Sequence, residues 1–202
     1  MYMQFSNAIS SLFLPKITGI VTINDDKKVV SNIFIRTGRL QFIILAYILV
    51  AFIVFGRQFI YLWAGPGYED SYIIACIFFI PLTIPLIQNI GITILQARNQ
   101  MKFRSILYIC IALISLIFQV YLSKIYGGIG CAVAVSGALF IGQIIIMNVY
   151  YSIKQKIDML VFWKEIFKMS FIPIILGMLF YNVFTNFFFL NDWYSFAFGV
   201  LL

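Results

Sequence analysis

Leu40 to Leu62 reads LQFIILAYILVAFIVFGRQFIYL, and Arg57 is the only charged residue in this stretch. A transmembrane helix needs about 20 mostly apolar residues to cross about 30 Å of hydrocarbon. Backbone groups in lipid must be hydrogen-bonded within their own segment, so an isolated apolar stretch of this length is helical. The stretch at 40–62 therefore predicts a helix that crosses a membrane.

Similar apolar runs recur on both sides of this stretch. We expect further spans at 71–95, 105–122, 128–151 and 170–189, a partial helix at 1–14, a polar connection at 16–39, an interfacial helix at 158–169 and a truncated span at 195–202. Of the 202 residues, 63% are hydrophobic and 10% charged, whereas a soluble domain carries about a quarter charged residues. The sequence predicts one all-α domain, 1–202, a polytopic transmembrane helix bundle with about five full spans and partial helices at both ends.

The basic residues lie in alternate connections between these runs. The first set is Lys16, Lys27, Lys28, Arg36, Arg39, Arg98, Lys102, Arg104, Lys154, Lys156, Lys164 and Lys168, and only Arg57 and Lys124 lie on the other side. Lys and Arg collect in cytoplasmic loops, so we expect the first set in the cytoplasm. Because the net charge of +7 is spread over short loops rather than one solvated face, nucleic acid is not an expected partner.

Charged groups that support catalysis or ion coupling are missing from the expected spans. The chain has no His, and all seven acidic residues fall in loops or at interfaces, Glu69 and Asp70 in what we interpret as a solvated loop. Intramembrane proton relays and cation sites need such groups within the spans. The three cysteines stand singly in apolar runs, as small buried hydrophobes do. We therefore expect no enzyme activity, no metal and no cofactor.

Arg57 is the one charge well inside an apolar run. Retaining Arg at mid-span costs about 2.5–3.5 kcal/mol on insertion scales. One interpretation is that the side chain reaches the interface near Trp63, as long basic side chains do. The other is that Arg57 faces a water-filled cavity and binds an anionic substrate group such as a phosphate through its forked donors.

Two prolines mark the second expected span. Pro81 and Pro85 each remove a backbone hydrogen bond and bend a helix, and Gln88 and Asn89 follow directly. Bent helices with adjacent amides line cavities in transporters, so Gln88 and Asn89 are candidate substrate ligands. A fixed kink packed by neighbouring helices is the alternative.

The fourth expected span carries small residues at intervals of four. Gly130, Ala134, Ala138 and Gly142 lie on one helical stripe. Small residues on one stripe let another backbone approach closely. We expect this stripe to be a helix-packing surface.

Five passages of the chain together resemble one protein family. The run FGRQFIYLWAGPGYEDSYIIACIF at 55–78 is followed by ITILQARNQMKFRS at 92–105, IYGGIGCAVAVSGAL at 125–139 and NVYYSIKQKID at 148–158, and ISSLFLPKITG at 9–19 precedes them. In order and spacing they resemble the C-terminal lobe of bacterial polysaccharide repeat-unit flippases (O-antigen or capsule), within the multidrug/oligosaccharidyl-lipid/polysaccharide exporter superfamily. These proteins have two six-helix lobes, so the resemblance implies an N-terminal lobe as partner, and we expect the chain to be a fragment of a longer transporter. A complete protein with unusual ends is the alternative.

This resemblance implies a transporter in the bacterial cytoplasmic membrane. Its substrate would be an undecaprenyl-diphosphate-linked oligosaccharide that passes between the leaflets, held in a cationic cavity while the lobes rock. Arg57 is then the candidate cavity charge, and Arg36 and Arg39 are candidates at the cytoplasmic mouth. A drug or cation antiporter of the same superfamily and an inactive fragment are the alternatives. A polymerase or glycosyltransferase would need a long outer loop or an acidic cluster, and the sequence has neither.

Overall fold

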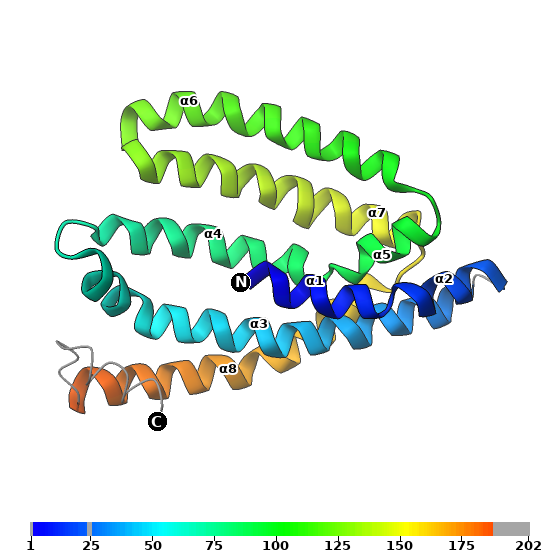
Figure 1. The fold of residues 1–202 in the computed structure, drawn as a ribbon, viewed down its shortest axis with the longest axis horizontal. Coiled ribbons are helices and arrows are strands. Elements are labelled where there is room, and N and C mark those ends of the chain that lie inside the picture. Colours follow the sequence, from blue (N-terminus) through cyan, green and yellow to red (C-terminus); the bar gives the residue numbers. More distant parts are fainter. Residues whose placement is uncertain (1, 24–25, 188–202) are drawn as a thin grey trace.

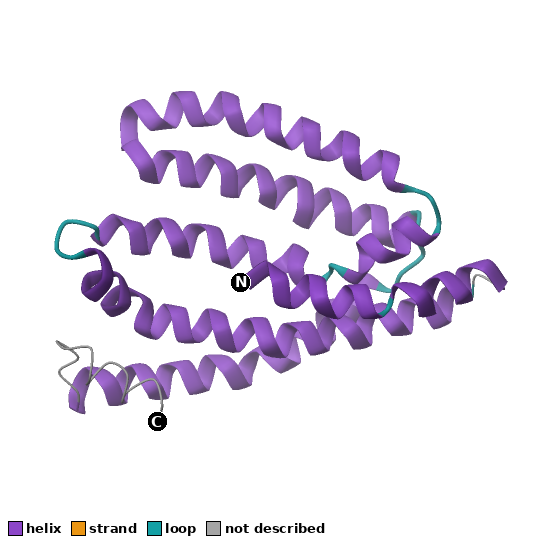
Figure 2. Cartoon of the chain, in the orientation of Figure 1, coloured by secondary structure: helices purple, strands orange, loops and turns teal. Residues whose placement is uncertain are grey.

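The computed structural model describes residues 2–23 and 26–187, with side chains as far as Asn182. Its elements are α1 (Tyr2–Leu12), α2 (Leu14–Ile23), α3 (Lys27–Ala64), α4 (Glu69–Ile87), α5 (Ile90–Ala97), α6 (Met101–Leu139), the π-helical segment η1 (Phe140–Ile146), α7 (Met147–Ile153) and α8 (Met159–Phe187). The described part of the chain contains helices and no strand (Figure 2). The all-α expectation is confirmed.

Three helical segments are long and apolar enough to cross a membrane. Within the described residues they are Lys27–Ala64, Glu69–Ile87 and Met101–Ile153. The third segment folds back on itself at Gly127, whose φ of 56° and ψ of −133° interrupt the helix. Its two arms form an antiparallel hairpin at one side of the bundle (Figure 1). These segments identify a membrane protein. Of the other expected spans, 170–189 ends beyond the described residues and 195–202 lies wholly outside them.

The expected polar connection over residues 16–39 is wrong, because this region is mostly helical. α2 includes Lys16, and α3 begins at Lys27 rather than at Leu40. Asp26 caps α3, since its Oδ1 accepts hydrogen bonds from the backbone N–H of Lys28 at 2.9 Å and of Val29 at 3.4 Å. The 38 residues of α3 extend about 57 Å, well beyond the hydrocarbon thickness. The charged residues of α3 lie within the helix and do not end it.

The expected separate helix at 158–169 is joined to the helix that follows it. Met159 begins α8, which continues through Ser170 without a break. Nothing between Lys168 and Phe171 ends a helix, and the Ser170 hydroxyl bonds back to the Ile166 carbonyl at 2.9 Å. Residues 159–169 are therefore the first part of α8 and not a separate helix, and their expected position at the membrane interface stays a prediction.

The best-buried core includes side chains from α3, α5, α7 and α8, among them Phe34, Ile90, Tyr151 and Phe162. The Phe34 ring centroid lies 5.7 Å from that of Tyr151 and 5.1 Å from that of Phe162. Tyr151 packs directly over Gly91, where a Cβ would meet its ring. By contrast, apolar residues on the first arm of α6 are exposed, as at Leu113 (60%) and Ile117 (67%). Such a face suits contact with lipid.

Candidate functional site

The second expected span is interrupted beyond its prolines. α4 continues as a helix through Pro81 and Pro85 and ends at Ile87, and α5 begins at Ile90. Pro85 has no N–H to donate to the carbonyl one turn earlier, which weakens the last turns of α4. The break itself falls at Gln88 and Asn89. The expected continuous span at 71–95 is therefore two helices.

Gln88 and Asn89 are buried and bond to neighbouring helices. Gln88 is 2% exposed and donates through Nε2 to Asn148 Oδ1 at 3.0 Å. Asn89 is 6% exposed and donates through Nδ2 to Asn7 Oδ1 at 2.7 Å. Asn148 Oδ1 also accepts from Trp163 Nε1 at 3.1 Å. These amides join α1, α7 and α8 to the break and satisfy buried polar groups. The structure places neither amide in one of the grooves or pockets described below.

Polar residues of α1 complete this buried network, and sequence reasoning did not single them out. Ser6 Oγ donates to the Leu86 carbonyl at 2.6 Å, close to the break. Gln41 of α3 donates through Nε2 to the Ser6 carbonyl at 3.1 Å and to Ser10 Oγ at 2.8 Å. Ser6 and Ser10 stand four apart, and this spacing places both hydroxyls on one helix face. That spacing was the available signal for a polar contact face on α1.

The small-residue stripe lies within the bundle. Gly130, Ala134, Ala138 and Gly142 are all buried. A Cβ on Gly130 would meet the Leu122 carbonyl group, and one on Gly142 would meet the Ile111 side chain, both on the first arm of α6. The neighbouring Ser136 donates to the Ile77 carbonyl of α4 at 2.8 Å. The stripe thus brings the arms of the hairpin together beside α4.

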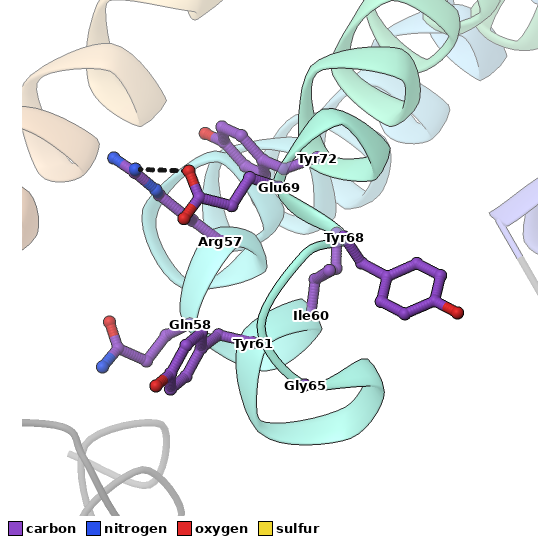
Figure 3. Close-up of a pocket in the computed structure, with 8 residues that line it drawn as sticks. All are labelled: Arg57, Gln58, Ile60, Tyr61, Gly65, Tyr68, Glu69 and Tyr72. Carbon is purple, nitrogen blue, oxygen red and sulfur yellow. Dashed lines mark hydrogen bonds and ion pairs between the residues drawn. The ribbon is translucent and has the colours of Figure 1, made fainter. Parts of the chain in front are cut away.

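Arg57 lies in a pocket near the C-terminal end of α3, away from the buried core around Phe34. The Arg57 pocket holds about 310 Å³ and is lined by Arg57, Gln58, Ile60, Tyr61, Gly65, Tyr68, Glu69 and Tyr72 (Figure 3). Arg57 Nη2 lies 3.4 Å from Glu69 Oε2, and their side chains are 73% and 70% exposed. Arg57 is therefore neither buried nor alone. The sequence interpretation of Glu69 as a purely solvated loop residue missed this pair.

The walls of the Arg57 pocket are held in place by backbone and ring contacts. The Tyr72 hydroxyl donates to the Ile53 carbonyl at 2.8 Å, and its ring stacks on Phe52 at 6.0 Å between centroids. The turn between α3 and α4 contains Gly65 and Gly67 at φ of 86° and 101°. These contacts fix Tyr72 relative to the end of α3.

Arg36 and Arg39 lie in the N-terminal half of α3, where Arg36 lines two grooves and Arg39 lines one of them. One groove of about 630 Å³ lies between α3 and α8, and its lining includes both arginines and Glu165. The other, about 530 Å³, lies between α2 and α3, and its lining includes Lys16 and Arg36. Arg39 Nη1 is 3.3 Å from Glu165 Oε2, whereas Arg36 forms no ion pair within the described residues. Arg36 is thus an exposed, uncompensated cation between both grooves.

The predicted site residues do not form one site. Arg36 and Arg57 stand on the same helix but about 32 Å apart along its axis, from the helical rise of about 1.5 Å per residue. Gln88 and Asn89 lie buried between other helices. No group of three metal-ligating side chains occurs within the described residues. Two separate polar surfaces remain, the Arg36 grooves and the Arg57 pocket.

Comparison of the chain with protein-family models, with curated proteins and with solved structures found no match.

Proposed function

We propose that this chain forms one lobe of a transporter that moves lipid-linked oligosaccharide repeat units across the bacterial cytoplasmic membrane. The ordered resemblance of five sequence passages to polysaccharide repeat-unit flippases supports this proposal. The structural observation that supports it best is Arg36, which has no ion-pair partner among the described residues and lies between two grooves on a helix that is apolar enough to cross a membrane.

The chemistry of Arg36 suits the diphosphate of such a substrate. A guanidinium donates two parallel hydrogen bonds to phosphate oxygens and stays charged at any physiological pH. The grooves also contain apolar side chains, Leu40 in both and Ile43 in one. An anionic headgroup at Arg36 would leave the attached isoprenoid chain beside apolar helix surface. Translocation makes and breaks no bond, so the proposed role is transport rather than catalysis.

The proposal includes a second lobe and an orientation. The substrate path in this family lies between two lobes, so activity requires an N-terminal lobe, with the basic loops in the cytoplasm. A drug or cation antiporter of the same superfamily is the nearest alternative. It would need an intramembrane carboxylate, and in this chain the described acidic residues lie at helix ends, in connections or, for Glu165, near the start of α8.

The test joins this chain to the first lobe of such a flippase in a strain that lacks its own flippase. The joined protein should restore surface polysaccharide. Arg36→Ala should lower export about tenfold or more at matched protein levels, because a charge-assisted phosphate contact contributes roughly 1.5–3 kcal/mol and about 1.4 kcal/mol corresponds to tenfold; Arg36→Lys should lower it less. Lys124→Ala, outside both grooves, is the matched control. A well-folded joined protein that exports no polysaccharide would remove the proposal.

A further inference from the structure

We infer that the Arg57 pocket binds the uncharged sugar part of a glycolipid, and not its phosphate. The inference rests on the proposed function for the source of this ligand. It reassigns Arg57, for which binding of a phosphate was one of the two interpretations of the sequence. The argument stands on the charge, the rings and the size of the pocket.

The charge of the pocket is balanced. Arg57 and Glu69 form an ion pair at 3.4 Å, so a phosphate placed against Arg57 would also meet the carboxylate. Asp70 follows Glu69 directly and adds a further negative charge nearby. Both partners keep hydrogen-bonding capacity, because a guanidinium has five N–H donors and a carboxylate accepts at two oxygens. A sugar hydroxyl both accepts and donates, so one sugar ring satisfies both groups together.

Aromatic rings stand on two sides of this pair. Tyr72 lies next to Glu69, and Tyr61 lies beside Gln58 on the other side of Arg57, whereas the Tyr68 ring points away from Arg57 (Figure 3). The Tyr61 side chain is half exposed, and Tyr72 is fixed by its bond to the Ile53 carbonyl. An aromatic face provides rigid apolar area with a polar tip, which matches the C–H face and hydroxyl rim of a sugar ring.

The volume of the pocket limits the ligand. About 310 Å³ is at the lower end of the roughly 300–1,000 Å³ typical of small-ligand sites. The pocket therefore holds a single ring of a repeat unit. Tyr and Trp also gather at membrane interfaces simply as anchors. Anchoring alone does not require an ion pair between the rings, and this pocket has the Arg57–Glu69 ion pair there.

Binding is measured on the chain in lipid nanodiscs, without glycoside detergents that would compete for the pocket. The probes are N-acetylglucosamine and N-acetylglucosamine 1-phosphate, detected by saturation-transfer NMR and by tryptophan fluorescence. Trp63, whose ring centroid lies 5.2 Å from that of Phe59, contributes to this fluorescence. We expect the neutral sugar to bind at least as tightly as its phosphate. Tyr61→Ala should weaken binding about two- to tenfold, and Tyr61→Phe should weaken it less.

Glu69→Gln separates charge from shape. This substitution should weaken binding of the neutral sugar about fivefold, because a charged hydrogen-bond acceptor becomes neutral. It should also make the sugar phosphate the tighter-binding probe, because Arg57 loses its anionic partner. Tyr126→Ala, at the turn of the α6 hairpin and 67% exposed in the parent, is the matched control and should bind as the parent does. Circular dichroism checks that each variant is folded.

Three results would overturn the inference. They are no sugar binding by the parent, tighter binding of the phosphate by the parent, and equal loss in the Tyr61 and Tyr126 variants. The measurement uses this chain alone, so its outcome is independent of whether a joined two-lobe protein exports polysaccharide. Sugar binding without export would refute the proposed function and support the sugar-binding inference. Export without sugar binding would support the proposed function and refute the sugar-binding inference.

Discussion

Gly130→Ala and Gly137→Ala form a matched pair that measures how closely the arms of the α6 hairpin approach. Both glycines lie on the second arm of α6. A Cβ at Gly130 would meet the carbonyl group of Leu122, a backbone atom pair that cannot rotate away, whereas a Cβ at Gly137 meets nothing within 4 Å. Replacing Gly by Ala inside a helix stabilises it by about 0.5–1 kcal/mol when space allows.

This propensity gain is common to both variants, so their difference reports the clash alone. Overpacking costs about 1–3 kcal/mol, and we expect Gly130→Ala to be less stable than Gly137→Ala by that amount. The assay is thermal unfolding in one mild detergent, followed by far-ultraviolet circular dichroism and by the folded fraction on size exclusion. The Gly137→Ala variant should be at least as stable to thermal unfolding as the parent. Equal stability of the two variants would refute the close approach of the arms.

Three further predictions test other parts of the fold. Gly127→Ala should destabilise the chain by about 1–3 kcal/mol, because a non-glycine residue would hold a positive φ there; an unchanged unfolding midpoint would contradict the fold-back. Asn89→Ala should lower the unfolding free energy by about 1–2 kcal/mol through loss of a buried hydrogen bond, while the exposed Gln96→Ala should have no effect; a similar midpoint for both would argue against the buried network. In a chain without its native cysteines, Lys154→Cys should react with a membrane-impermeant thiol reagent only after cell lysis and Lys124→Cys in intact cells; the reverse pattern would invert the proposed orientation.

The sequence predicted those structural features that depend on a single property of the residues, such as hydrophobicity or size. Long apolar runs predicted helices that cross a membrane, and small residues at intervals of four predicted the face that the structure buries. Arg57 is an intermediate case. Its place inside an apolar run was evident, but its partner Glu69 lies across a turn, and hydropathy gives no information about pairing across a turn.

Other features depend on three-dimensional neighbours and could not be predicted in this way. Charged residues at Lys27 and Lys28 indicated a loop, yet a helix continues through charge once it leaves the hydrocarbon and has a cap such as Asp26. Gln88 and Asn89 have the same chemistry whether they bind a substrate or a neighbouring helix. Their hydrogen-bond partners in the structure, Asn148 and Asn7, lie far away in sequence.

The π-helical segment Phe140–Ile146 has a consequence for how this chain tolerates changes in length. A π-turn contains an additional residue relative to an α-turn, so one extra residue is taken up within η1 and the helix after it keeps its rotational phase. Deleting one residue between 140 and 146 would restore an α-helix and leave α7 facing the same neighbours, with Tyr151 still over Gly91 and Asn148 still beside Gln88. In an uninterrupted α-helix the same deletion turns everything that follows by about 100°. A deletion of one residue should therefore be tolerated better in η1 than within α7.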